Sequence, residues 1–179
     1  MGTVAIVDYG VGNLKSVANA LSYLGCSSCI TADPAELERA DAIILPGVGA
    51  FPDAADRLRS GGLDQHVLAQ GQKKPVLGIC LGMQLLLEQG REVRPCPGLG
   101  VIRGTVDRIP TQSKLPHIGW NSLRFFHHSP LFRGLDEGAY VYFVHSFSAQ
   151  DTDPAQVIAV TDYGPAVTAA GSRGDFYGT

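Results

Sequence analysis

Short apolar runs and segments of helical periodicity alternate along the first half of the chain. The apolar runs predict buried strands at residues 3–8, 28–31, 42–45 and 75–79. A helix is predicted after the first run, with Asn13 as its N-cap and Gly25 as its stop, and helical patterns continue up to residue 74 and over 82–89. Strands that alternate with helices predict a parallel sheet covered by helices on both faces.

The second half has five apolar runs with no long helix between them, at residues 101–109, 121–126, 139–147, 156–161 and 166–170. This arrangement predicts strands that extend the sheet in antiparallel fashion. No internal repeat, low-complexity tract or linker divides the chain. The sequence therefore predicts one α/β domain over residues 1–179, with a flavodoxin-like, open, mostly parallel sheet, helices on both faces and an antiparallel extension.

Composition narrows the class of protein. Hydrophobic residues make up 45% and charged residues 17% of the 179 residues, which is enough apolar material for a full core and excludes global disorder. The formal net charge of -3 and the lack of a basic stripe argue against nucleic acid as a partner. No apolar run approaches the roughly 18 residues of a membrane span, and the N-terminus lacks the charged and apolar regions of a secretion signal. We therefore expect a cytoplasmic protein with no membrane association.

Two short motifs indicate neither a metal site nor a cofactor. Cys26 and Cys29 form a CxxC, but no second CxxC or HxxxH supplies further metal ligands. We expect these two residues to lie buried or half-buried beside a strand, in a chain without disulfides. The loop 10–12 resembles the start of a dinucleotide fingerprint, yet Lys15 stands where a third small residue is needed and Ser28 where an acid is needed.

The most informative segment is Gly78-Ile79-Cys80-Leu81-Gly82, a G-x-C-x-G sequence at the junction of a predicted strand and a predicted helix. It resembles a nucleophile elbow with cysteine as the nucleophile, because a sharp turn between flanking glycines lifts the central side chain above the sheet edge. The helix N-terminus would favour the thiolate of Cys80, and the Leu81 amide would face an oxyanion beside the sulfur. The alternative is a buried cysteine between two packing glycines.

Two further features bear on this chemistry. The loop 46–52 follows a strand, at the sheet edge where the ligands of open α/β sheets collect, and its glycines can turn backbone amides toward a negative oxygen. The alternative for this loop is a tight turn without a ligand. A thiol nucleophile also needs a base, and spacing alone favours His145 among the five histidines. A single histidine is, however, more often structural than catalytic.

Taken together, these residues resemble the class I, triad-type glutamine amidotransferases. The resemblance extends from residue 3 to the last residue. Within this family it is nearest to the glutaminase subunits of imidazole glycerol phosphate synthase. The motifs that carry it are VDYGVGNLKSV (7–17), LPGVGAF (45–51), GICLGMQLLLE (78–88), LPHIGWN (115–121), YFVHSF (142–147) and FYG (176–178).

The resemblance implies that Cys80 attacks the side-chain amide of glutamine, forms a thioester and releases ammonia. It implies a heterodimer in which ammonia passes through the barrel of a cyclase subunit that makes imidazole glycerol phosphate and AICAR in histidine biosynthesis. It assigns no metal and no cofactor. By match of motif residues it assigns the amides of Val48 and Leu81 to an oxyanion hole, and glutamine contacts to Gly49, Gln84, Glu92, Ser146 and Phe147.

The same resemblance implies a cyclase interface at Asn13, Ile118, Trp120 and Tyr142, on the edge that carries Cys80. An exposed Trp and Tyr near the mouth of an active site suit an interface hot spot. The alternative for Trp120 is a core anchor, since Trp is highly buried on average.

The family's base and orienting acid lie in a His-Pro-Glu segment just after the FYG strand, and this sequence stops at Thr179, before that segment. We therefore expect the C-terminal end of the domain to be incomplete and the 179-residue form to be inactive alone. A non-catalytic subunit that binds the cyclase is the alternative that this absence favours. Cys80, Gln84 and the loop 46–52, which begins with Pro-Gly-Val-Gly (the PGVG loop), favour an enzyme. A thiol-based sensor or esterase is a third possibility, against which the glutamine-contact residues count.

Overall fold

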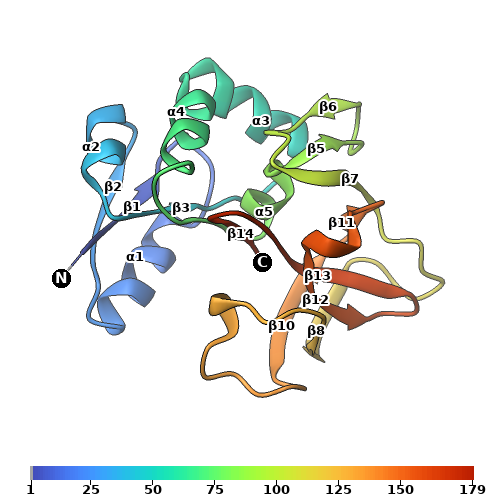
Figure 1. Cartoon of the computed structure of the whole chain (residues 1–179). Coiled ribbons are helices and arrows are strands. Elements are labelled where there is room, and N and C mark those ends of the chain that lie inside the picture. Colours follow the sequence, from blue (N-terminus) through green and yellow to red (C-terminus); the bar gives the residue numbers. More distant parts are fainter. Residues whose placement is uncertain (1) are drawn as a thin grey trace.

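One long sheet between helices organises the computed structural model, which describes residues 2–179 (Figure 1). Its strands lie in the order β2-β1-β3-β4-β14-β13-β12-β9. The first five strands in this order run parallel to one another. They are β2 (Ser27–Thr31), β1 (Thr3–Val7), β3 (Ala42–Leu45), β4 (Val76–Gly78) and β14 (Phe176–Gly178). The predicted α/β class with a mostly parallel sheet is therefore confirmed.

Helices cover both faces of the sheet. In Figure 1, α1 (Leu14–Tyr23) lies on one face, and α2 (Pro34–Arg39), α3 (Phe51–Ser60) and α4 (Leu63–Gln70) lie on the other. The side chain of Asn13 accepts a hydrogen bond from the Ser16 amide at 3.3 Å and so caps α1, as predicted. After α1 ends, Gly25 has a φ of +73°, the left-handed conformation that makes glycine a helix stop.

The second half of the chain forms three groups of strands. The strands β13 (Ala166–Arg173), β12 (Val157–Asp162) and β9 (Arg124–Phe125) continue the main sheet in antiparallel fashion, as predicted. The rest of the predicted extension is separate. A four-stranded sheet has the order β11 (Phe147–Gln150), β7 (Ile102–Arg108), β5 (Leu87–Gly90) and β6 (Cys96–Pro97), and β8 (His117–Ser122) pairs with β10 (Tyr140–His145) in a two-stranded sheet. Two short 3₁₀ helices lie at Pro130–Phe132 and Pro154–Gln156.

The helix predicted over 82–89 is wrong in its second half. Helix α5 spans Leu81–Leu85, and the chain then continues as β5, which pairs with β7 and β6. Leu85, Leu86 and Leu87 are all fully buried. A continuous buried run of this kind has no periodicity that could separate a helix from a strand, so the distant partner strand decides the conformation.

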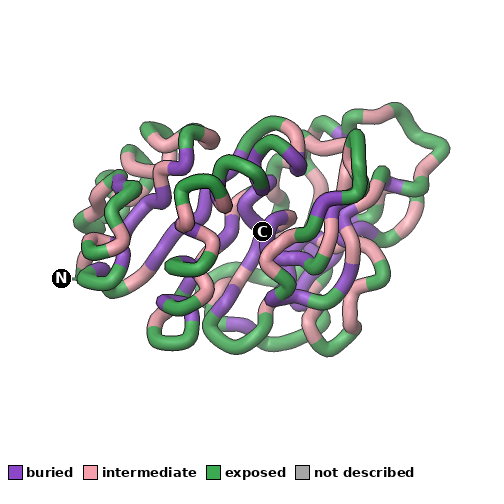
Figure 2. The backbone as a smooth tube through the Cα atoms, turned by 90° about the horizontal axis from the view of Figure 1, so that it is seen from above, coloured by how far each residue is buried: buried purple, intermediate pink, exposed green. Residues whose placement is uncertain are grey.

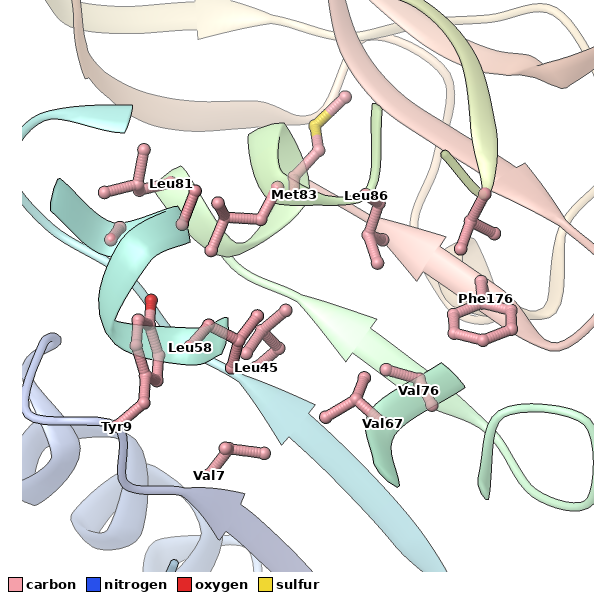
Figure 3. Close-up of a cluster of buried hydrophobic side chains, with 14 of the residues drawn as sticks. Val7, Tyr9, Leu45, Leu58, Val67, Val76, Leu81, Met83, Leu86 and Phe176 are labelled. Carbon is pink, nitrogen blue, oxygen red and sulfur yellow. The ribbon is translucent and has the colours of Figure 1, made fainter. Parts of the chain in front are cut away.

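The main core lies between the central sheet and the helices of one face. Figure 2 shows the buried segments as the inner strands, with exposed helices and loops around them. Figure 3 shows side chains from the strands, such as Leu45 and Val76, beside Leu58 of α3 and Val67 of α4. The turn after β4 is part of this core through Leu81 and Met83. The same apolar contacts that stabilise the domain therefore fix the position of Cys80.

Three features that bear on function class can be stated for the described residues. No helix within residues 2–179 is long and apolar enough to cross a membrane. The same residues contain no group of three or more His, Cys, Asp or Glu side chains that could hold a metal ion. Cys29 is half-buried in β2, as expected, whereas Cys26, in the connection between α1 and β2, is exposed.

Lys74 connects the end of α2 with the start of β4. Its ammonium donates hydrogen bonds to the carbonyl oxygens of Leu37, Glu38 and Ala40, at 3.1, 2.6 and 2.5 Å. These carbonyls lie at the C-terminus of α2, where no later helical amide can reach them. Lys74 therefore uses its three donors to complete the hydrogen bonding of a helix end.

Replacement of Lys74 by methionine keeps an apolar side chain of similar reach and removes all three donors. We expect the free energy of unfolding to fall by about 1–3 kcal/mol, because carbonyls that are partly buried lose their partners. Denaturant unfolding measures this change. Lys73→Met is the matched control, since Lys73 is exposed and should change stability by less than about 0.5 kcal/mol. Equal losses in both variants would contradict this role of Lys74.

Candidate active site

Cys80 occupies the strained position of a sharp strand-to-helix turn. Strand β4 ends at Gly78 and α5 begins at Leu81, and Cys80 lies between them with φ +56° and ψ −116°. A positive φ is uncommon for a residue with a side chain, and a strained position of this kind costs about 1–3 kcal/mol. The backbone conformation is thus that of a nucleophile elbow, as the G-x-C-x-G spacing predicts.

Glycines let the turn approach its neighbours closely enough to hold this conformation. A Cβ on Gly82 would lie 1.8 Å from the carbonyl oxygen of Leu45, at the end of β3, and a Cβ on Gly78 would lie 2.6 Å from the Gly82 carbonyl oxygen. Backbone hydrogen bonds then fix the turn: the Ile79 amide donates to the Leu45 carbonyl at 3.0 Å, and the Cys80 amide donates to the Thr179 carbonyl at 2.7 Å. The strain at Cys80 is therefore held by contacts to two adjacent strands.

The surroundings of the Cys80 thiol favour its neutral form. Cys80 is exposed as a residue, yet burial of the thiol raises its pKa above the ordinary value, and the hydrogen bond from the Leu81 amide lowers it only in part. Burial is the larger effect, so the net shift of the Cys80 pKa is opposite to the expectation that the helix N-terminus would favour the thiolate. The Leu81 amide does lie at the sulfur, where an oxyanion donor is expected.

The PGVG loop is fixed at both ends and open in the middle. The Tyr9 hydroxyl donates to the Pro46 carbonyl at 2.6 Å, and the Glu92 carboxylate accepts from the Phe51 amide at 2.8 Å. Between these two anchors, Val48 is 53% exposed, and Gly49 has a φ of +95°. Burial, and to a lesser extent the nearby Cys80, raises the pKa of Tyr9, so its hydroxyl stays a hydrogen-bond donor.

A pocket opens beside Cys80 and brings together part of the expected glutamine site. Its volume of ≈ 230 Å³ is smaller than the roughly 300–1,000 Å³ of pockets for drug-sized molecules, so it suits a ligand of amino-acid size. Cys80, Gln84 and Phe147 line it, and the Gln84 side-chain amide donates to the Phe147 carbonyl at 3.3 Å. Val48, Gly49, Leu81, Glu92 and Ser146, the other residues expected at the site, are not among the lining residues.

His145 lines the same pocket as Cys80, but its ring nitrogens are already engaged. Nδ1 contacts the Phe147 carbonyl oxygen at 3.1 Å, and Nε2 contacts Nδ1 of His117 at 3.0 Å. Burial is the main cause that lowers the pKa of His145. No Asp or Glu side chain is among the residues that line this pocket. Within residues 2–179, the pocket therefore offers no free base for Cys80.

The ribbon of β8 and β10 exposes one apolar face. Ile118, Trp120 and Tyr142 are 57%, 66% and 54% exposed, so the alternative of Trp120 as a core anchor is wrong. Trp120 and Tyr142 are directly paired across the two strands, and their rings meet edge to face at 5.5 Å. Asn13, the fourth expected interface residue, is exposed and caps α1.

Several residues of the exposed ribbon face, of the PGVG loop contacts and of the pocket wall were not predicted from the sequence. Tyr140 and Val144 belong to the exposed face of the ribbon, and their every-second-residue spacing with Tyr142 was the available signal. Tyr9 and His117 lie inside two of the recognised motifs, but no spacing in the sequence indicates that Tyr9 contacts the PGVG loop or that His117 contacts His145. Such contacts depend on strand pairing between distant segments.

Comparison with known proteins identifies the family. The profile described as "Glutamine amidotransferase class-I" matches residues 5–179. The imidazole glycerol phosphate synthase subunit HisH of Bacillus cereus is 45% identical over 178 residues, which are 98% of this chain and 84% of that protein. The HisH subunit of Oceanobacillus iheyensis is also 45% identical, over 98% of this chain and 88% of its own.

Solved structures agree in fold. A crystal structure of a glutamine amidotransferase matches 99% of this chain and 88% of its own, with a TM-score of 0.77 at 19% identity. The structure of PurLQS from Thermotoga maritima matches 99% of this chain and 85% of the matched chain, with a TM-score of 0.75 at 18% identity. At these identities the likeness concerns the fold, whereas the family follows from the profile and the sequence relatives. The chain belongs to the class I glutamine amidotransferase family.

Proposed function

We propose that this chain is the glutaminase subunit of an imidazole glycerol phosphate synthase, and that it hydrolyses glutamine to glutamate and ammonia for a cyclase partner. The observation that carries the proposal is the strained Cys80 turn at the edge of a pocket lined by Gln84 and Phe147. The identity of 43–45% to HisH subunits over nearly the whole chain supports the same assignment. A non-catalytic subunit would gain nothing from the strain at Cys80.

Cys80 is the proposed nucleophile. Its Sγ forms a bond to the side-chain amide carbon of glutamine, and the amide oxygen becomes an oxyanion that the Leu81 amide stabilises. The Val48 amide is the proposed second donor, since the loop around Gly49 is open toward solvent. The C–N bond then breaks, and ammonia leaves with the proton of the thiol. Water hydrolyses the thioester, which releases glutamate and returns a proton to the sulfur.

Glutamine is recognised, in this proposal, by Gln84 and Phe147, which line the pocket, and by Ser146 and Glu92, which lie outside its lining. Gln84 and the Ser146–Phe147 segment bind the amino-acid end of the substrate. Glu92, whose Oε2 accepts from the Phe51 amide, keeps Oε1 for the substrate ammonium. In this geometry Glu92 connects substrate binding with the end of the PGVG loop.

Proton transfer requires a base that residues 2–179 do not supply at the pocket. The thiol of Cys80 has a raised pKa, so it needs a base more than an ordinary thiol does. The Cys80 amide donates a hydrogen bond to the Thr179 carbonyl, so strand β14 ends beside the Cys80 turn. Any residues attached after Thr179 would therefore start next to Cys80, which is where the family's His-Pro-Glu segment would have to act.

The exposed face of the β8–β10 ribbon is the proposed cyclase interface. It presents Ile118, Trp120, Tyr140, Tyr142 and Val144 to solvent. Large apolar patches of this kind mark binding sites for other proteins. Residues 141–145 of the same ribbon also line the Cys80 pocket, so a partner on this face would lie close to the site where ammonia forms. We further propose that the complex acts in the cytoplasm, where amino-acid biosynthesis takes place.

Glutamate release in the presence of purified cyclase tests the proposed reaction. We expect the 179-residue chain to release glutamate at least about 10²-fold more slowly than a chain extended after Thr179 by a His-Pro-Glu segment from a family member, because general acid–base catalysis contributes about 10²–10⁴-fold. Cys80→Ala in the extended chain is the control and should abolish release. No release by the extended chain, or release that survives Cys80→Ala, would refute the proposal.

Trp120→Ala tests the interface. Truncation of a central aromatic hot spot costs about 2 kcal/mol or more, so we expect the dissociation constant for the cyclase to rise at least about 30-fold. Calorimetric titration measures it, and circular dichroism checks that the isolated variant stays folded. Tyr23→Ala, which removes a 91% exposed aromatic residue from α1, is the matched control and should leave binding unchanged. Equal effects of both variants would sink the assignment.

A further inference from the structure

A row of hydrogen bonds runs from the Cys80 pocket into the protein. Nδ1 of His145 meets the Phe147 carbonyl oxygen at 3.1 Å, Nε2 of His145 meets Nδ1 of His117 at 3.0 Å, and Nε2 of His117 meets Oδ1 of Asn121 at 2.9 Å. The side-chain amide of Asn121 donates from Nδ2 to the Asp162 carbonyl at 2.9 Å. That last bond fixes the orientation of the Asn121 amide, so its oxygen faces His117.

The number of protons in this row follows from its ends. The Phe147 carbonyl and the Asn121 amide oxygen are both acceptors and bring no hydrogen to the row. Three hydrogen bonds therefore need three protons on the four imidazole nitrogens. Two neutral imidazoles carry two protons between them, one each. The complete row thus requires one extra proton, and His117 and His145 together carry one positive charge when all three bonds are made.

The surroundings of His117 can accommodate that charge. His117 is 1% exposed, and its ring is stacked against Tyr163 at 3.9 Å and Phe143 at 5.0 Å. The faces of aromatic rings attract cations. Burial acts in the opposite direction and lowers the pKa of His145, and the neighbouring His117 lowers it further, while the bond to Phe147 raises it.

Few other titratable groups face the pair. Across the pocket lies the Cys80 thiol. Tyr163 faces His117 through its ring, and its hydroxyl donates to the Lys114 carbonyl. Asp162 contributes only its backbone carbonyl, since its carboxylate lies 3.7 Å from Arg124. No Asp or Glu side chain is hydrogen-bonded to either imidazole within residues 2–179, so the proton of the pair is not held by an ion pair.

We propose that His117 and His145 are positioning residues that share one extra proton and thereby hold the Phe147 carbonyl at the wall of the glutamine pocket. The same carbonyl accepts the hydrogen bond of Gln84 at 3.3 Å, so the pair orients both proposed contacts to the substrate. The inference rests on the proposed glutaminase function. When the extra proton leaves at higher pH, one of the three bonds is lost, and glutamine binding weakens. The burial of His145 moves this loss to a lower pH than for an ordinary histidine.

Nitrogen-15 NMR of the 179-residue chain tests the shared proton directly, because protonated and bare imidazole nitrogens have distinct chemical shifts. We expect three protonated nitrogens among the four of His117 and His145 at about pH 5 and two at about pH 8, within the range where histidine titrates. We also expect the dissociation constant for glutamine, measured by calorimetry, to rise about five-fold over this range, as for the loss of one hydrogen bond. Two protonated nitrogens at every pH would overturn the proposal.

His117→Gln separates this role from a merely structural one. A glutamine can still donate to His145 but does not titrate, so the pH dependence of glutamine affinity should disappear while the fold persists. His128→Gln makes the same change at an exposed histidine and should keep the pH dependence. A pH dependence that survives His117→Gln would contradict the proposal. If His117→Gln does not fold, the proton count in the unaltered chain decides. A confirmed proton count without glutamine binding at any pH would overturn the proposed function, and not the shared proton.

Discussion

The candidate site depends on how closely the turn after β4 approaches the end of β3. Only a residue without a side chain fits at Gly82, where a Cβ would lie 1.8 Å from the Leu45 carbonyl oxygen. The approach lets the Ile79 amide donate to that carbonyl and sets Cys80 at a positive φ. Leu81 and Met83 then pack into the main core, so burial of apolar surface offsets the strain of about 1–3 kcal/mol at the cysteine. The chemistry at Cys80 thus has its origin in the packing of two parallel strands.

The position of the turn also explains why the other parts of the site meet there. Parallel strands have their carboxyl ends at one edge of the sheet, and the PGVG loop after β3, the elbow after β4 and the end of β14 share that edge. Tyr9, which follows β1, holds the beginning of the PGVG loop, and Glu92 holds its end. Strand β10 lines one side of the pocket, and its side chains Tyr140, Tyr142 and Val144 are exposed to solvent. Strand β10 therefore belongs both to the wall of the Cys80 pocket and to the proposed partner face.

Patterns within short stretches of sequence predicted the fold where local contacts decide it. Strands β1, β3 and β4 lie inside the sheet and are mostly buried, so each is a short apolar run, and Asn13 and Gly25 mark the ends of α1 by their own chemistry. The motifs likewise located Cys80 and its glycines. The helix over 82–89 was wrong after Leu85, because β5 exists only through its pairing with β6 and β7. The contact between His117 and His145 had no local signal either, since it follows from the antiparallel register of β8 and β10.

The strained turn presents Cys80, and no other cysteine within residues 2–179, to a pocket that suits a ligand of amino-acid size. Alkylation of the 179-residue chain by a glutamine-derived chloroketone, with mass spectrometry of each cysteine, tests it most directly. We expect Cys80 to be labelled first and free glutamine to slow its labelling, whereas iodoacetamide, which has no affinity for the pocket, should label the exposed Cys26 at least as fast. Preferential labelling of Cys26, Cys29 or Cys96 by the chloroketone, or labelling of Cys80 that glutamine does not slow, would contradict it.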